Sequence, residues 1–323
     1  MVSYFKEALH GLGKVHVSNN CKTYSMTLAD ASVITPDIYD ATYINFLINY
    51  SYDNHISAII PLFDIDLPIL AKNREKFTEA GIKVIVSDFD VTQICNDKWK
   101  SHNFFIQKGF LTPGTFISLQ ECLNALSQGA VYFPLIIKPR WGMGSISVYS
   151  VSDHNELHVL YTKVRNEIEK TYLRFESKYD NDKCVVIQQY LAGEEYGLDI
   201  LNDLNGDLLA CIPKKKISMR AGETDIALTV DCKELSDIGS ILSSEVKHIG
   251  NMDVDCIKHE GRFYILEMNC RFGGQYPFCH VAGANFPKVI VDLLLNTEPD
   301  PRDLHATYGV YCVKDIRPQL FNW

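Results

Sequence analysis

Several features that mark other protein classes are absent from this sequence of 323 residues. Its ten cysteines include no C-x-x-C pair, so we expect reduced thiols and no zinc site. No apolar run approaches the roughly 20 residues of a membrane-spanning helix, and the start lacks the apolar stretch of a secretory signal. With 31 basic against 40 acidic residues and a net charge of −9, a broad nucleic-acid surface is disfavoured. We therefore expect a cytoplasmic protein with neither membrane nor nucleic-acid partners.

Two common nucleotide-binding motifs are also missing. The sequence contains no Walker A loop of the form G-x-x-x-x-G-K-[ST]. The glycine-containing turn after residue 140 is not a Rossmann fingerprint, because we expect a strand rather than a helix to follow it. A nucleotide site would therefore need another kind of phosphate-binding loop.

The first 95 residues alternate between predicted helices and strands, which indicates an α/β unit with a parallel sheet. Helices are expected at 43–52 and 66–80, and strands at 58–62 and 83–86. The first strand of such a unit is not visible, so either the unit lacks an edge strand or the sequence begins late.

The remaining residues predict an α+β arrangement with antiparallel sheets. We expect a two-lobed domain at 96–295, with a lid lobe at about 112–187, and a tail at 296–323 with one strand. Within the lobes, helical patterns occur at 97–108, 155–179, 237–248 and 284–295. Strand patterns occur at 134–138, 184–191, 196–201, 208–213, 227–231, 252–258 and 263–268.

The strongest chemical signal lies in the last of these predicted hairpins. Side chains alternate along a strand, so Glu267, Asn269 and Arg271 share one face. On the partner strand, Asp253 and Asp255 alternate in the same way, and the tight turn brings both acidic faces together. An oxygen-only set of this kind suits Mg²⁺, with Mn²⁺ as an alternative, and Arg271 is placed to bind phosphate oxygens. The competing interpretation is a solvated hairpin face.

Two further segments are consistent with a nucleotide site but weak by themselves. An apolar strand delivers Lys138 to a flexible loop that contains Gly142, Gly144 and Ser145, which suits phosphate binding or a plain hairpin. The strand at 184–191 ends in Gln188, Gln189, Tyr190 and Leu191, whose backbone groups suit an adenine edge. Glu195 follows, where a carboxylate could hold ribose hydroxyls. The competing interpretation is an ordinary strand–turn–strand.

Taken together, these three segments resemble the ATP-grasp superfamily in order and spacing, over roughly residues 40–295. The resemblance is greatest to the large subunit of carbamoyl phosphate synthase and related carboxylate–amine ligases. It implies that Lys98 and Lys138 are ATP-binding lysines, that residues 188–191 form the adenine hinge, and that Glu195 binds ribose. It also implies that Glu267 and Asn269 are metal ligands and that Arg271 is the adjacent arginine.

One metal ligand stays ambiguous, and three positions depart from the family pattern. The spacing of biotin carboxylases points to Asp255 and that of carbamoyl phosphate synthases to Asp253; we favour Asp255. The hinge often begins with Glu rather than Gln188, which affects hydrogen bonding to adenine. The lid loop reads Gly-Ser-Ile-Ser from Gly144 instead of Gly-Ser-x-Gly, and Cys270 stands where Pro is common.

A local basic cluster at 214–220 is unusual in an acidic chain. It is either a charged loop or, in the resemblance, the face toward the phosphates and the acyl substrate. On that interpretation, Lys216 and Arg220 contact the anions. His280 is expected to be a packed histidine rather than a substrate residue.

The expected function is an ATP-dependent ligase that joins a small-molecule carboxylate to an amine through an acyl phosphate. Amino acids or peptide-like metabolites are the default substrates, and a homodimer is left open. A small-molecule kinase on the same fold and a nucleotide-binding module without turnover are the alternatives.

Overall fold

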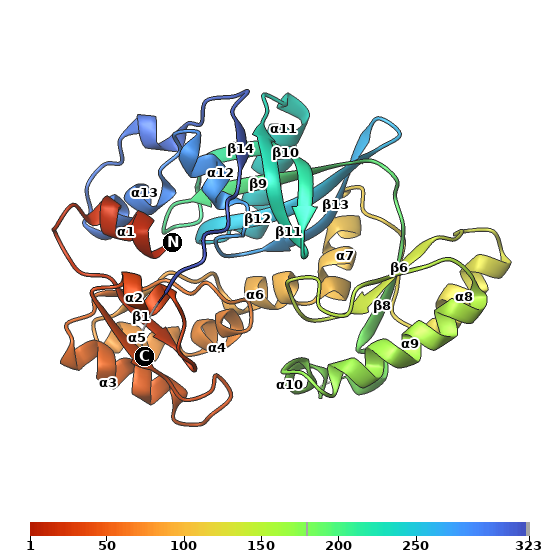
Figure 1. Ribbon diagram of the computed structural model, residues 1–323, viewed down its shortest axis with the longest axis horizontal. Coiled ribbons are helices and arrows are strands. Elements are labelled where there is room, and N and C mark those ends of the chain that lie inside the picture. Colours follow the sequence, from red (N-terminus) through yellow and green to blue (C-terminus); the bar gives the residue numbers. More distant parts are fainter. Residues whose placement is uncertain (179, 321–323) are drawn as a thin grey trace.

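The computed structural model describes residues 1–178 and 180–320 and contains three parts: a small N-terminal unit, a lid lobe and a large antiparallel sheet (Figure 1). In Figure 1 the N-terminal unit lies at the lower left, the lid lobe at the right and the large sheet at the top. The predicted combination of an α/β unit with antiparallel sheets is confirmed. No helix among the described residues is long and apolar enough to cross a bilayer.

The N-terminal unit consists of short helices and two pairs of parallel strands. Its elements are α1 (Val2–Leu9), β1 (His16–Asn19), α2 (Ser25–Leu28), β2 (Ala31–Ile34), α3 (Tyr43–Asp53), β3 (Ala58–Ile59), α4 (Asp66–Lys72), α5 (Arg74–Glu79) and β4 (Lys83–Val84). β1 pairs with β2, and β3 pairs with β4, which makes two separate sheets within the described residues. The helix predicted at 66–80 is divided at Asn73, whose side-chain amide donates to the carbonyl of Ile69 at 2.9 Å.

Two helices, α6 (Phe89–Asn96) and α7 (Lys98–Gln107), lead from this unit to the lid lobe. Asp97 caps α7, because its carboxylate accepts from the N–H groups of Trp99 at 3.0 Å and Lys100 at 3.2 Å. The same carboxylate accepts from Arg140 Nε at 2.8 Å and Nη2 at 2.7 Å. Both partners of this ion pair are buried, so it fixes the start of α7 against the end of a lid strand.

The lid lobe is a four-stranded antiparallel sheet covered by helices. It contains β5 (Thr115–Phe116), α8 (Leu119–Ser127), β6 (Leu135–Pro139), β7 (Tyr149–Val151), α9 (His154–Ile168), α10 (Leu173–Ser177), the 3₁₀ helix η1 (Asn181–Lys183) and β8 (Val185–Gln189). The strand order is β5-β8-β6-β7. The helix predicted at 155–179 is interrupted between α9 and α10, and its last position, 179, lies outside the described residues.

The large sheet carries the predicted acidic hairpin at one edge. Its strands are β9 (Glu194–Asn202), β10 (Leu208–Arg220), β11 (Glu223–Thr229), β12 (Gly250–His259), β13 (Arg262–Asn269) and β14 (Tyr311–Val313), in the order β13-β12-β9-β10-β11-β14. The accompanying helices are α11 (Lys233–Val246), α12 (Tyr276–Val281), α13 (Phe286–Leu294) and the 3₁₀ helix η2 (Pro301–Leu304). The single tail strand is present as β14, while residues 321–323 of the predicted tail lie outside the described residues. The domain boundaries proposed at 95 and 295 stay predictions.

A buried histidine links the strand β9 to the segment that leads into β12. His248 is fully buried, and its imidazole lies 3.0 Å from the carbonyl of Ile200 and 3.3 Å from the amide of Asn202. Burial lowers the pKa of His248 to about 4, because a charged imidazolium is poorly solvated there.

This shift predicts a loss of stability in acid. Between pH 4 and 6.5 the unfolded chain binds a proton at His248 that the folded chain excludes. The unfolding free energy is therefore not reduced by this group above pH 6.5 and decreases as the pH drops below it. When the pH is lowered from 7 to 5, we expect the unfolding free energy of His248→Gln to decrease by about 2 kcal/mol less than that of the wild type. Urea denaturation at both pH values measures this difference; equal losses in the two proteins would contradict the prediction.

Candidate active site

The two strands of the hairpin bring Asp255 and Glu267 directly opposite each other. In the β12–β13 register, Asp255 pairs with Glu267 and Asp253 pairs with Asn269. Directly opposite residues in antiparallel strands have Cβ atoms about 5 Å apart, so the two carboxylates are neighbours. We call Asp255 and Glu267 the acid pair.

Cations from three different elements surround the acid pair. Lys216 Nζ on β10 lies 2.5 Å from Asp255 Oδ1. Burial by itself would raise the pKa of Glu267, yet this pKa lies below its usual value. The cause is the field of four nearby cations, Lys98, Lys138, Lys216 and Arg271.

Asp255 responds in the opposite direction. Burial raises the pKa of Asp255 to about 6, and the carboxylates of Asp253 and Glu267 add to the rise although Lys216 opposes it. Crowded carboxylates of this kind suit a divalent cation. Within residues 1–178 and 180–320, no three His, Cys, Asp or Glu side chains are grouped to hold a metal ion. The donor set is therefore two carboxylates and the Asn269 amide, which fits Mg²⁺ only where substrate phosphates complete the shell.

Arg271 is more constrained than the sequence indicates. Its Nη2 and Nε donate to Asp64 Oδ2 at 2.9 and 3.2 Å, and its Nη1 donates to Asp253 Oδ2 at 3.1 Å. The guanidinium is thus held between two carboxylates rather than standing free beside the acid pair. The contact of Asp64 with Arg271 was not predicted from the sequence, because the two residues are 207 positions apart. Asp64 lies in the short loop between β3 and α4.

Gln275 is a second residue that sequence analysis missed. Its side-chain amide donates to Asp253 and, at 3.3 Å, to Asp255 Oδ1. A Cβ at Gly197 of β9 would overlap this amide, so glycine there leaves the Gln275 amide in its place. Glycine inside a predicted strand is the one local signal of such a close approach. Since Asp253 is already bound by Arg271 and Gln275, Asp255 is the acid that faces Lys216 and Glu267.

The lid lobe contributes Lys138 and the glycine loop. Lys138 Nζ donates to Gln188 Oε1 at 3.0 Å, and Gln188 Nε2 donates to Thr115 Oγ1 at 3.0 Å. Lys98 Nζ, at the start of α7, donates to the carbonyl of Gly142 at 2.5 Å. Ser145 lies against Gly222 in the β10–β11 turn, where an added Cβ would stand 2.5 Å from Ser145 Oγ. The loop is therefore folded over the large sheet.

Comparisons with known proteins show which families the chain resembles. Residues 1–85 match the model of a PylC-like N-terminal domain, and residues 181–316 match an ATP-grasp model described as belonging to a biosynthetic pathway with the Ter operon. The biotin carboxylase domain dimer of Hydrogenobacter thermophilus 2-oxoglutarate carboxylase superposes with a TM-score of 0.74 at 16% identity, over 96% of this chain and 70% of that one. The chain therefore has an ATP-grasp fold.

Other relatives agree with this assignment. A carbamoyl-phosphate synthase of Methanobrevibacter smithii is 22% identical over 96% of this chain and 78% of its own length. An L-amino acid ligase of Bacillus licheniformis superposes with a TM-score of 0.71 at 19% identity, over 94% of this chain and 75% of that one. The chain spans only 9% of an acetyl-CoA carboxylase of Dictyostelium discoideum and 61% of a D-alanine–D-alanine ligase of Thermotoga maritima.

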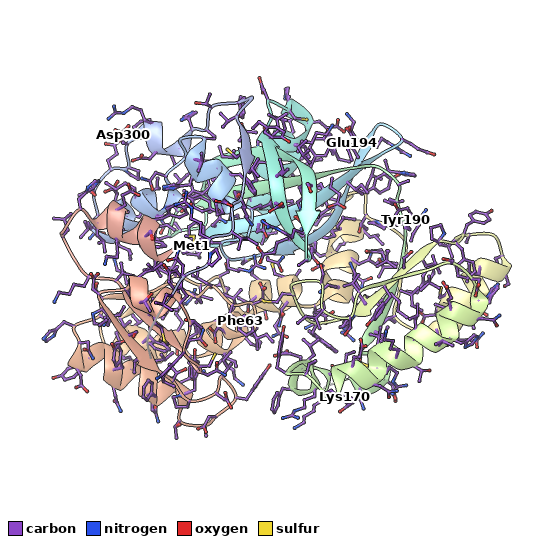
Figure 2. The ribbon with its side chains drawn as sticks, in the orientation of Figure 1. Met1, Phe63, Lys170, Tyr190, Glu194 and Asp300 are labelled. Atoms are coloured by element: carbon purple, nitrogen blue, oxygen red, sulfur yellow. The ribbon has the colours of Figure 1, made fainter. Side chains whose placement is uncertain are left out.

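The predicted adenine hinge of this ATP-grasp fold connects the lid lobe to the large sheet, and Figure 2 shows Tyr190 on that connection. Gln189 is anchored to the turn before β5, since its backbone N–H donates to the carbonyl of Gly114 at 2.8 Å. Tyr190 is exposed and Leu191 is buried. Burial opposes a rise in the pKa of Lys216, yet this pKa is raised, chiefly by Asp255; Glu195 lies near enough to add to the rise.

Arg220 does not join the cluster around the acid pair. It lies four residues beyond Lys216 along β10, is exposed, and forms an ion pair with Asp225. His280 stacks on Tyr4 at 3.9 Å between ring centroids, which agrees with a packed histidine. The geometry therefore brings Lys98, Lys138 and Lys216 around the acid pair and leaves Arg220 at the outer end of its strand.

The pKa of Lys138 predicts that nucleotide affinity depends on pH. Burial lowers the pKa of Lys138 to about 8, although Glu267 opposes this shift. Only the protonated ammonium attracts phosphates, so we expect affinity for ATP with Mg²⁺ to fall up to about tenfold from pH 7 to pH 9. Calorimetric titration measures this affinity at each pH. The Lys138→Arg variant, whose side chain stays charged, should lose most of the pH dependence. A wild-type affinity that is constant over this range would contradict the prediction.

Proposed function

We propose that this protein of ATP-grasp fold is an ATP-dependent ligase that activates a small-molecule carboxylate as an acyl phosphate and joins it to an amine or similar nucleophile. The observation that carries the proposal is the acid pair on neighbouring strands, surrounded by cations from β6, β10 and α7. Binding a nucleotide without turnover would need fewer buried charges.

Each group has a distinct part in the proposed site. Asp255, Glu267 and Asn269 hold Mg²⁺, which would neutralise phosphate charge and orient the outer phosphates. Lys98 and Lys138 bind phosphate oxygens, while the hinge at 188–191 and Glu195 bind the adenosine. Arg271 donates to the phosphoryl group during transfer.

Lys216 is expected to change partners when ligands bind. The ammonium of Lys216 lies 2.5 Å from the Asp255 carboxylate and would have to give up this contact if Asp255 held a divalent ion. The phosphates, or the substrate carboxylate, then attract the released ammonium. Lys216 would in this way bring a positive charge to the reacting groups, whereas Arg220 is the weaker candidate because Asp225 neutralises it.

The folded-over glycine loop supports an intermediate that must avoid water. The loop is held by two contacts, from Lys98 to Gly142 and from Ser145 to Gly222. Water would hydrolyse an acyl phosphate, so a closed loop protects it until the amine attacks. The protein needs no nucleophile of its own for these steps. Assembly into a homodimer remains a prediction.

The reaction predicts that ADP release depends on two substrates together. Two of the relatives are named as amino-acid ligases, so amino acids in pairwise combination are the first substrates to screen. We expect release of ADP only when an acid and an amine are both present, measured by a coupled assay. Release with one substrate alone would support the kinase alternative, and no release with any pair would support a binding module.

Removal of one charge from the acid pair tests the site itself. We expect Glu267→Gln to reduce turnover by roughly 100-fold or more, because phosphate charge in the transition state loses its metal. Glu260→Gln is the matched control, since Glu260 lies in the turn of the same hairpin and is exposed. Thermal unfolding of both variants verifies the fold; a Glu267→Gln protein with wild-type turnover would rule out this site.

A further inference from the structure

The guanidinium of Arg271 is bound by Asp64, a residue that lies outside the large sheet. Of the five N–H groups of a guanidinium, the bonds within the described residues use four. Nε and Nη2 donate to Asp64, and Nη1 donates to Asp253 and, at 3.3 Å, to the carbonyl of Phe272. One N–H on Nη2 is left, and its direction depends on Asp64, because the same nitrogen binds that carboxylate.

The loop that carries Asp64 is firmly placed. Asp64 is only 4% exposed, and its neighbours Ile65 and Leu67 are buried in the core of the N-terminal part. The backbone forms a turn there, with Asp66 N–H donating to the carbonyl of Phe63 at 3.0 Å and Leu67 N–H donating to that of Asp64 at 3.3 Å. A carboxylate on a fixed turn can hold a guanidinium in one orientation.

The same loop meets the lid lobe. The ring of Phe63 packs edge-on against Tyr172, which precedes α10, with centroids 5.8 Å apart. Figure 2 places Phe63 near the middle of the molecule, beside the lid lobe. Residues 63 and 64 therefore lie where the N-terminal unit, the lid and the segment after β13 come together.

We propose that Asp64 is a positioning residue, which aims the remaining N–H of Arg271 at the phosphoryl group in transfer. The inference rests on the proposed function, because it needs a nucleotide at the acid pair. Arg271 between two carboxylates carries little net positive charge, so its contribution is directional. Without Asp64, Asp253 remains as its carboxylate partner and the guanidinium turns toward β12.

The test compares two Asp→Asn changes on one turn. Asp64→Asn keeps the shape and removes the charge that holds Arg271. Asp66→Asn is the matched control, because Asp66 is also largely buried and binds the Tyr43 hydroxyl at 3.1 Å instead of Arg271. The probe is ADP with Mg²⁺, titrated by calorimetry with and without aluminium fluoride, which mimics a phosphoryl group in transfer.

We expect aluminium fluoride to increase the affinity for ADP with Mg²⁺ in the wild type and in Asp66→Asn. In Asp64→Asn we expect this tightening to fall by about tenfold, while affinity for ADP with Mg²⁺ alone changes by less than about twofold. In an Arg271→Lys background, Asp64→Asn should have no further effect, because the two residues act as one unit. Asp64→Glu should restore part of the tightening.

The outcomes separate this inference from the proposed function. Full tightening in Asp64→Asn, or independent and multiplying effects of the two substitutions, would overturn the role of Asp64. The same holds if fluoride leaves wild-type ADP binding unchanged, because Arg271 then contacts no transferring group. A wild type that binds no ADP with Mg²⁺ would refute the nucleotide site itself, and with it both proposals.

Discussion

The site depends on the compensation of charge around two partly buried carboxylates. Asp255 and Glu267 are forced together by the β12–β13 register, and burial makes their negative charges costly. Cations can offset that cost only from within a few ångströms. The three lysines come from different elements, with Lys98 on α7, Lys138 on β6 and Lys216 on β10. The charged site therefore exists only when the lid lobe and the large sheet are in contact.

This arrangement also explains why several neighbouring side chains are neutral or small. Gln188 accepts from Lys138 without neutralising it, so the ammonium stays available to an anion. Gly197 leaves room for the Gln275 amide, which joins Asp253 to Asp255. The departure from the usual glutamate at the hinge thus has a physical consequence, since a carboxylate there would pair with the lysine permanently.

Within residues 1–178 and 180–320, one ion pair, from Asp64 to Arg271, connects the N-terminal unit to the candidate site. Asp64 and Arg271 are both largely buried, so loss of either partner would leave an uncompensated charge. The contact between Phe63 and Tyr172 adds the lid to the same junction. The lid lobe and Arg271 therefore both contact the same short loop.

The sequence by itself determined those features that follow from local periodicity. Alternation along β13 placed Glu267 and Asn269 on one face, and the turn at 259–261 fixed their hairpin partners; Arg271 lies two residues beyond the end of the strand. The lysine near the end of β6 and the glycine loop after it were likewise predicted from a local pattern. Helices α6 and α12 and the break at Asn73 were not predicted, because tertiary contacts and a side-chain hydrogen bond decide them.

Only the tertiary structure decided which remote groups face the acid pair. Nothing in the spacing of residues 64 and 271 indicates an ion pair, since 207 positions separate them and loop packing brings them together. Asp253 and Asp255 likewise differ in their partners rather than in their strand positions, and Asp255 as the third metal ligand stays a prediction. Periodicity fixes the direction of a side chain, whereas its partners depend on how distant segments pack.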